Sequence, residues 1–471
     1  MMVLVTENVG ERLRGYRPVL ALSAPIAGIQ LAQVALTTVD LAMMGLIGVT
    51  AVAAGGMALL LYNQLRTMTV GMVTGIGNQI AAAAGRGEKR TGTDELDETA
   101  RAEIRNLNRS AFLVATVVAV VGALILVAIG FLLPWFGQSD DVVDLARPMM
   151  MALAPGLLPM LWLNVLRQFA VGMHRPGSLL NVTLVSIGVN AALNGAFIYG
   201  WLGIPKLGTT GVGLATSLVQ VFTLVVFCSR VRRDSHLTGL LALDFWKADR
   251  DTVRRIVKMG TPIALTYGNE AAITSVATLL MGAFGPAMLA ASNVVNQLAQ
   301  MVYQLNIGLS QGSSILISRS VGAGDRDAAG RIAQRALTLG GAAMTVFALI
   351  YIVAPRPVLD LFLHQDDGAE VITTATALLW FAIAHQYCKG AQNICVGLLR
   401  GLGNTTSSLR ITLIGYWAVG IPAMLITAYL LNWRGYGVWF GLCLGFGATA
   451  VLMFRRFRAE LRTESVEAAL H

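Results

Sequence analysis

Apolar runs of about 20 residues recur along this chain and constrain its fold more than any other feature. A run of that length forms a helix that crosses about 30 Å of hydrocarbon, and a helix satisfies its own backbone polar groups inside a bilayer. We count twelve runs, near residues 18–43, 50–75, 112–134, 148–172, 178–200, 210–230, 257–282, 287–315, 337–354, 371–398, 408–431 and 436–454. The sequence therefore predicts an all-α polytopic membrane protein with twelve transmembrane helices.

The composition agrees with a membrane protein. Hydrophobic residues make up 55% of the 471 residues and charged residues only 13%, whereas a soluble globular domain carries about 25% charged residues. The four cysteines all lie within the apolar runs or at their ends, where packing is their expected role. The first apolar run is too long for a cleavable signal peptide, so we expect it to remain in the protein.

The basic residues report the topology. The net charge is +9, and most Lys and Arg lie at one set of span ends, whereas Arg147, Lys206, Arg356 and Arg434 lie at the other. The positive-inside rule then assigns both termini and the longer connections to the cytoplasm. An even number of spans is consistent with that assignment. We expect contact with the lipid bilayer and no nucleic-acid partner.

The two halves of the chain repeat each other at an offset of 237 residues. Pro25-Ile26-Ala27 aligns with Pro262-Ile263-Ala264, and several glycines align with them. Each repeat holds six predicted spans, and because six is even the repeats have the same orientation in the membrane. We predict two parallel six-helix lobes, residues 1–236 and residues 237–471.

The first span carries a polar stripe that ends in a carboxylate. Gln33, Thr37 and Asp40 follow one another by four and three residues, which puts them on one face of a helix. A lipid-facing helix would not carry unpartnered polar groups. The stripe therefore faces the interior, and an intramembrane carboxylate indicates a functional site.

Several motifs together resemble the multidrug and toxic compound extrusion (MATE) family, in its bacterial NorM-like form. The motifs are VDLAMMG in the first span, LRQFAVGM at 166–173, VNAALNGAFIYG at 189–200, GTTGVGLAT before the sixth span, GLLRGLGNT at 397–405 and GYGVWFG at 435–441. The resemblance covers nearly the whole chain. It implies a V-shaped cavity between two lobes, export of organic cations and amphipathic drugs, and a drive from inward Na⁺ or H⁺ flow across a bacterial inner membrane.

The resemblance also implies a cation site in the first lobe. Asp40, Asn190, Asn194 and Thr216 match positions that form this site in relatives, with Na⁺ or H⁺ as the coupling ion. A carboxylate with amide and hydroxyl oxygens suits a proton, or a weak Na⁺ site at Asp40, Asn190 and Asn194 completed by water. The alternative is that the amides only bond neighbouring helices together.

The second lobe departs from the family pattern. Glu270 matches the acidic residue of the family's second Na⁺ site, but its aspartate partner is replaced by Lys389, and a nearby tyrosine position is His385. An ammonium in place of a carboxylate repels Na⁺. We therefore expect a buried Glu270–Lys389 ion pair that is either structural or opens during transport, and coupling centred on Asp40.

The remaining cavity candidates widen the range of substrates. We expect Gln33, Thr37, Arg66, Glu270, His385 and Lys389 to line the substrate cavity. Arg66 and Lys389 make this cavity less acidic than a purely cation-selective cavity. Drug and organic-cation efflux is the main prediction, and the alternatives are an exporter of anionic or zwitterionic metabolites, or a lipid-linked precursor flippase of the same superfamily.

Enzyme functions are not favoured. The sequence contains no Gly-Lys dipeptide and hence no Walker A loop, and its five histidines show no metal-ligand spacing. We expect a monomeric transporter without a cofactor, in which H⁺ or Na⁺ is only the coupling ion. A membrane scaffold or receptor is disfavoured by the intramembrane charges.

Overall fold

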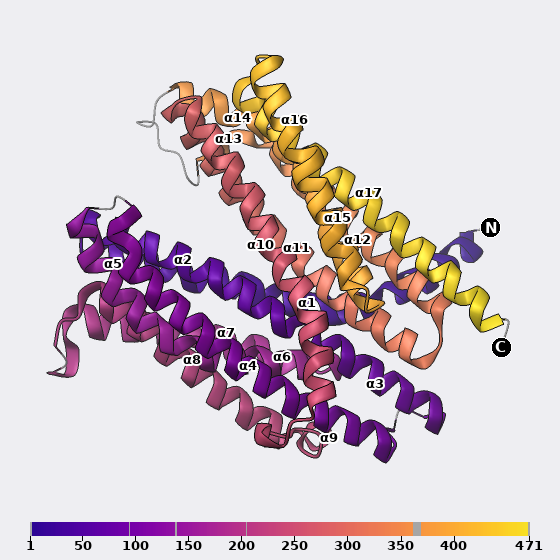
Figure 1. Ribbon diagram of the computed structural model, residues 1–471. Coiled ribbons are helices and arrows are strands. Elements are labelled where there is room, and N and C mark those ends of the chain that lie inside the picture. The colour runs from indigo at the N-terminus through magenta and orange to yellow at the C-terminus, as the bar shows by residue number, and fades with distance from the viewer. Residues whose placement is uncertain (1, 94, 137–138, 204, 361–368, 470–471) are drawn as a thin grey trace. The chain divides into compact units, whose positions relative to one another are not determined.

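The computed structural model describes the whole chain apart from residues 1, 94, 137–138, 204, 361–368 and 470–471. Its elements up to the middle of the chain are α1 (Met2–Gly45), α2 (Val49–Thr74), α3 (Ile76–Thr91), α4 (Glu98–Leu132), η1 (Leu133–Phe136), α5 (Asp140–Leu153), η2 (Ala154–Gly156), α6 (Leu157–Gly172), α7 (Gly177–Tyr199), η3 (Trp201–Gly203), α8 (Gly208–Arg233), α9 (Ser235–Thr238) and η4 (Phe245–Lys247). The later elements are α10 (Arg250–Ala283), α11 (Pro286–Ala323), α12 (Arg326–Val353), α13 (Pro355–Leu359), α14 (Ala369–Gly401), α15 (Thr405–Leu413), η6 (Ile414–Gly420), α16 (Ile421–Leu425), η7 (Ile426–Leu430) and α17 (Arg434–Ala469). No β-strand occurs in these described parts, so the all-α prediction is confirmed (Figure 1).

Every predicted span coincides with a helix or a continuous helical segment. Nine helical segments among the described residues are long and apolar enough to cross a membrane. The other three predicted spans lie on α2, α10 and α11, whose apolar runs are interrupted by polar or charged groups that include Arg66 and Glu270. Such groups lower the mean hydropathy of a helix, and inside a membrane they mark functional positions.

The chain divides into two compact units. One comprises residues 28–267, and the other comprises residues 1–27 together with 268–471. Helices α1 and α10 therefore contribute to both units, and each contains an internal proline close to the division, Pro25 and Pro262. A proline inside a helix removes one backbone hydrogen bond and makes that point easier to bend. The lobe boundary at residues 236 and 237 concerns the sequence repeat and stays a prediction.

In the unit of residues 28–267, a chain of packed helices positions the polar groups. Helix α7 packs along α8, α8 along α5, and α5 along α2. Close approach of α5 and α8 depends on Gly213, because a Cβ there would lie 2.8 Å from the carbonyl oxygen of Met149. The α7–α8 pair brings one face of each helix toward α1, which explains how residues more than 140 positions apart form one site.

In the other unit, α14 packs along both α11 and α17. The α11–α14 contact uses a glycine, Gly397, whose added Cβ would collide with the backbone carbonyl oxygen of Ser310. The Ser310 hydroxyl in turn donates to the carbonyl oxygen of Asn393 at 2.7 Å. Small residues of this kind let helix backbones approach closely in a membrane. They bring α14, which carries His385 and Lys389, against its neighbours.

Two π-helical turns interrupt the span of residues 408–431. Segments η6 (Ile414–Gly420) and η7 (Ile426–Leu430) flank the short α16, which contains Pro422. Proline lacks a backbone N–H and its ring clashes with the carbonyl four residues earlier. The wider π turns accommodate that defect without ending the helix. The buried side chain of Tyr416 comes from the first of these turns.

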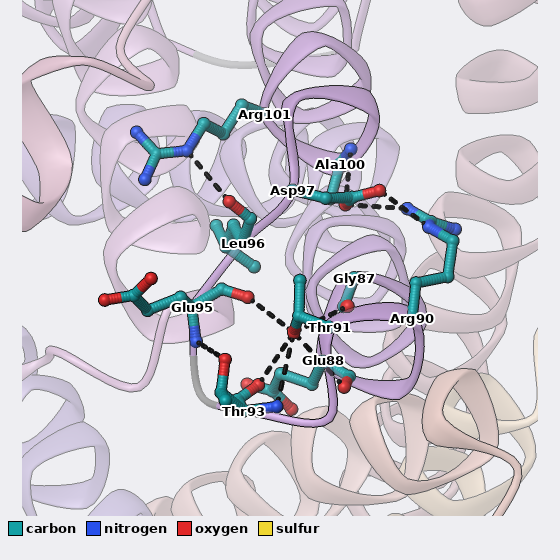
Figure 2. A network of polar contacts seen from close by, with 10 residues as sticks. All are labelled: Gly87, Glu88, Arg90, Thr91, Thr93, Glu95, Leu96, Asp97, Ala100 and Arg101. Carbon is teal, nitrogen blue, oxygen red and sulfur yellow. Dashed lines mark hydrogen bonds and ion pairs between the residues drawn. The ribbon is translucent and has the colours of Figure 1, made fainter.

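The connection between α3 and α4 is held by an exposed polar network (Figure 2). Arg90 donates from Nε and Nη2 to both carboxylate oxygens of Asp97, at 2.7 and 2.9 Å. Asp97 also caps α4 by accepting from the backbone N–H of Ala100 at 3.1 Å. The hydrogen bonds from Arg90 are the main reason that the pKa of Asp97 lies below its usual value. The network fixes where α4 begins.

The junction after α8 is anchored to α4. Arg109 donates from Nε to Asp244 at 2.7 Å, and Asn108 donates to the backbone carbonyl of Leu240 at 3.0 Å. The hydrogen bond from Arg109 lowers the pKa of Asp244. A hydrogen bond from Thr252 similarly lowers the pKa of Asp249 at the start of α10. The contacts of Arg109 and Asn108 hold the basic junction against α4 within the unit of residues 28–267.

Candidate functional site

The carboxylate of Asp40 is the centre of a buried hydrogen-bonded cluster. Its side chain comes from α1 and is 1% exposed. Asn190 and Asn194 of α7 donate from Nδ2 to Asp40 Oδ1 at 2.6 and 2.8 Å, and Thr216 of α8 lies 3.0 Å from Oδ2. The structure thus brings together the four residues proposed from the sequence. Whether they couple a cation stays a prediction.

The spacing of the two asparagines explains their shared partner. Residues four apart lie one above the other on a helix face, so both amides of α7 reach the same carboxylate oxygen. Their own oxygens, Asn190 Oδ1 and Asn194 Oδ1, are buried and have no hydrogen-bond partner. The cluster therefore contains two acceptor atoms with nothing to accept from. Buried acceptors of this kind are uncommon and call for a donor, a water or a cation.

The hydroxyl of Thr216 has two acceptor oxygens within reach but only one hydrogen to donate. Its hydroxyl lies 3.0 Å from Asp40 Oδ2 and also 3.0 Å from the carbonyl oxygen of Val212, one turn earlier in α8. A hydroxyl donates only one hydrogen but accepts as well. It can donate to an ionised Asp40, or donate to Val212 and accept a hydrogen from a protonated Asp40. The same geometry thus serves both protonation states of the carboxyl group.

A small cavity adjoins the cluster. Its lining residues are Gln33, Leu36, Thr37, Asp40, Leu59, Tyr62, Asn63, Arg66, Thr216 and Gln220. The space open to the centres of water molecules is about 40 Å³, and one water needs about 10–15 Å³ on that measure. The cavity accommodates a few waters or an ion, and it is too small for a drug-sized molecule.

Two guanidinium groups belong to the same region. Arg66 lines the cavity, and its Nε is buried without a hydrogen-bond partner. Arg167 is 5% exposed, and its two Nη atoms donate to the side-chain oxygen of Gln33 at 3.0 and 3.1 Å when that amide oxygen faces them. Gln33 thus links a second positive charge to the cavity wall. The Thr37 hydroxyl lies 3.3 Å from the carbonyl oxygen of Gln33 on its own helix.

Tyr62 is a cavity residue that the sequence reasoning missed. Its side chain is 3% exposed, and its hydroxyl is buried without a partner beside Asp40 and Arg66. The available signal was its spacing, because Tyr62 precedes Arg66 by one helical turn and so shares its face. Because tyrosine is largely apolar, Tyr62 was not distinguished from the packing residues of the span.

The second group of sequence candidates forms a separate cluster in the unit of residues 1–27 and 268–471. Lys389 Nζ of α14 lies 3.3 Å from Glu270 Oε1 of α10, and the two side chains are 13% and 12% exposed. The ion pair proposed from the sequence is therefore present. His385 lies one turn before Lys389 and is 4% exposed, with its ring edge against Trp439 and Phe446. These ring contacts account for the burial of His385.

A family profile described as MatE matches residues 25–195 and residues 262–426. Together these ranges cover well over half of the chain. The chain belongs to the MatE family. The two MatE matches begin 237 residues apart, which is the offset of the sequence repeat. MatE proteins are transporters and not enzymes, so the membrane-transport prediction is confirmed at that level.

Curated MatE relatives match over nearly their full length. A probable multidrug resistance protein NorM of Rhizobium meliloti (strain 1021) is 32% identical over 457 residues, with 96% of this chain and 95% of the relative covered. A probable multidrug resistance protein NorM of Pseudomonas aeruginosa is 32% identical over 438 residues, with 92% and 87% covered. These bacterial relatives identify a multi-span membrane protein of the NorM-like branch.

Solved MatE structures share the fold. The crystal structure of the eukaryotic MATE transporter AtDTX14 has a TM-score of 0.81 at 18% identity, covering 96% of this chain and 98% of that one. A MOP superfamily transporter from Pyrococcus furiosus, described by the reverse polarity of its binding pocket, has a TM-score of 0.83 at 17% identity, covering 95% and 96%. At these identities the likeness concerns the fold alone.

Proposed function

We propose that this MatE protein is a secondary active exporter that exchanges amphipathic or cationic compounds for H⁺ or Na⁺, with Asp40 as the coupling group. One observation carries the proposal. A carboxylate that is 1% exposed has only neutral hydrogen-bond partners, and two further oxygens of those partners are unpaired. The proposed location is a bacterial inner membrane with both termini cytoplasmic.

The electrostatics of the Asp40 cluster explain how an ion would be coupled. An ionised carboxylate in a membrane interior is costly unless it is compensated by a cation. A proton on Asp40 removes the charge, and Na⁺ would draw on the same carboxylate together with the amide, hydroxyl and water oxygens. An organic cation near Asp40 also needs the carboxylate ionised and uncompensated. The coupling ion and the substrate therefore exclude each other, which is the requirement for exchange.

The membrane potential supplies part of the drive. One elementary charge that moves inward across the membrane gains about 2.3 kcal/mol per 100 mV. Exchange of an inward cation against a neutral or less charged substrate would use that energy directly. The MatE relatives named as multidrug resistance proteins support small amphipathic compounds as substrates.

Reconstituted transport tests the proposal. Ethidium efflux from proteoliposomes is measured with an imposed pH gradient, with an imposed Na⁺ gradient and with neither. We expect one gradient to drive efflux by the wild type, and Asp40→Asn to lose that response. The matched control is Asp144→Asn, which changes an exposed carboxylate of the same unit. Gradient-driven efflux by Asp40→Asn at the wild-type rate would refute coupling through Asp40.

A second substrate class is favoured by the arginines. Arg66 lines the cavity that Asp40 lines, and Arg167 is held next to it by Gln33. Guanidinium groups bind carboxylates and phosphates. In a state of the transport cycle in which this cavity is wide enough to admit a substrate, a zwitterion would present an amine to Asp40 and an anionic group to an arginine. Export of zwitterionic compounds is therefore the second candidate function.

A further inference from the structure

The ammonium group of Lys389 is enclosed by groups from three other helices. Glu270 of α10 lies 3.3 Å from Nζ. The ring of Tyr303 of α11 has its centroid 4.2 Å from Nζ, and the ring of Phe446 of α17 has its centroid 5.5 Å away. The carboxylate and the two rings are named the ammonium box below. It lies entirely within the unit of residues 1–27 and 268–471.

The composition of the ammonium box selects a kind of cation. A carboxylate neutralises the charge, and aromatic faces replace water around an organic ammonium. Na⁺ instead needs several oxygen ligands, which the two ring faces do not offer. The box therefore has the chemistry of an organic-ammonium site.

The Phe446 wall of the box is held by its neighbours. Phe446 packs edge-on against Tyr416 and His385, with ring centroids 5.0 and 5.2 Å apart. His385 packs in turn against Trp439, whose indole N–H donates to Ser292 at 3.1 Å. Tyr416, Phe446 and Trp439 are each at most 1% exposed. Such packing keeps the ring of Phe446 in position when the ammonium leaves.

We propose that Glu270, Tyr303 and Phe446 form a binding site for the ammonium group of an organic cation, and that Lys389 is its built-in occupant. A substrate amine takes the place of Lys389 Nζ, and the flexible four-carbon stem lets Lys389 move away. The inference rests on the proposed function only for the identity of the occupant as a transported organic cation. Binding to the box is measurable without transport.

Lys389→Ala creates the vacancy that tests the box. The substitution removes three carbons and the ammonium nitrogen, which is the size of n-propylammonium. Thermal unfolding of the full chain in detergent is followed against n-propylammonium chloride, with n-propanol and NaCl as the comparison additives. We expect a saturable rise in Tm with n-propylammonium alone. The apparent Kd should be at least about tenfold lower than that of the wild type, in which Lys389 competes for the box.

Companion variants assign the effect to the ammonium box. Glu270→Gln or Phe446→Leu, added to Lys389→Ala, should weaken n-propylammonium binding by about tenfold or more. Lys206→Ala, which removes an exposed lysine, should bind n-propylammonium no better than the wild type. Lys389→Ser leaves nearly the same vacancy without the ammonium group and is the second variant if the alanine variant does not fold.

Three outcomes overturn the inference. They are equal Kd values for the wild type and Lys389→Ala, an equal Tm rise with NaCl, and binding that survives Glu270→Gln. The proposed function fails separately, because it is tested by gradient-driven efflux, whereas the box is tested by the difference in n-propylammonium binding between Lys389→Ala and the wild type, which both keep Asp40. The efflux measured for Asp40→Asn therefore neither supports nor contradicts the proposal of the ammonium box.

Discussion

The hydroxyl of Thr216 lies 3.0 Å from Asp40 Oδ2 and 3.0 Å from the carbonyl oxygen of Val212. One hydrogen is thus shared between a titratable carboxyl group and a helix carbonyl. By reorienting, the hydroxyl can bond to the carboxyl group in either protonation state without a change in the backbone, as proton coupling through Asp40 would require. The asparagines do not have this property, since their N–H groups already face the carboxylate.

Thr216→Val should slow gradient-driven efflux several-fold, because it removes the hydroxyl and keeps the shape of the side chain. Thr216→Ser should retain most of the activity, because it keeps the oxygen. Initial rates of ethidium efflux from proteoliposomes measure both. Thr183→Val, which removes a buried hydroxyl that bonds only to its own helix at Leu179, is the control. Equal rates for Thr216→Val and the wild type would contradict a role for this hydroxyl.

The helices were predictable from local rules, whereas the Asp40 cluster came from the family resemblance. Apolar length identified the spans, and the spacing of Asn190 and Asn194 put their amides on one face. The resemblance connected both asparagines and Thr216 to Asp40, which no spacing rule does. The geometry of the hydroxyl between two acceptors was not predictable, because it depends on the distance between α1 and α8.

The aromatic walls of the ammonium box were not predictable either. Tyr303 and Phe446 are apolar residues in apolar helices, and nothing in their spacing distinguishes them from core residues. The same holds for the bond between Gln33 and Arg167, which joins residues 134 positions apart on different helices. Pairings of this kind depend on helix packing, and a single sequence does not contain that information.

The Glu270–Lys389 pair should behave as a coupled unit in unfolding. Glu270→Gln alone leaves a largely buried ammonium and should lower the free energy of unfolding by about 3–5 kcal/mol. Glu270→Gln combined with Lys389→Met removes both charges and should restore most of that loss. A double-mutant cycle from denaturant unfolding measures the coupling. Single-variant losses that simply add would show that the two charges do not depend on each other.

Replacing each of two glycines by alanine should change the stability of the protein in opposite directions. Gly397→Ala places a Cβ against the backbone carbonyl oxygen of Ser310 and should cost about 1–3 kcal/mol. Gly341→Ala, in α12, meets nothing within 4 Å and should stabilise the helix by about 0.5–1 kcal/mol. Thermal unfolding in detergent compares them. A Tm for Gly397→Ala that does not fall below that of the wild type would argue against the close α11–α14 approach.

The Arg109–Asp244 ion pair should make stability depend on pH in the acid range. Because Arg109 lowers the folded-state pKa of Asp244, the pair stabilises the fold above the unfolded pKa of about 3.9. That contribution is lost as the pH falls through the lowered folded-state pKa. Asp244→Asn should therefore reduce Tm at about pH 6 and converge with the wild type well below about pH 4. Arg109→Met should give the same convergence, and a gap that persists in acid would contradict it.

Arg66 should distinguish zwitterionic from cationic substrates. A guanidinium that lines the Asp40 cavity stabilises a substrate carboxylate and repels a second positive charge. Arg66→Gln should therefore reduce the efflux of a rhodamine that carries a free carboxylate by about tenfold. Efflux of the matching rhodamine ethyl ester, which lacks that negative charge, should be unchanged or faster. Arg147→Gln, a half-buried arginine of the same unit that donates to the carbonyl oxygen of Gly130, is the matched control. An equal reduction in efflux of the acid and of the ester would mean that Arg66 maintains the cavity but does not discriminate between substrate charges. Zwitterion export would then lose its support.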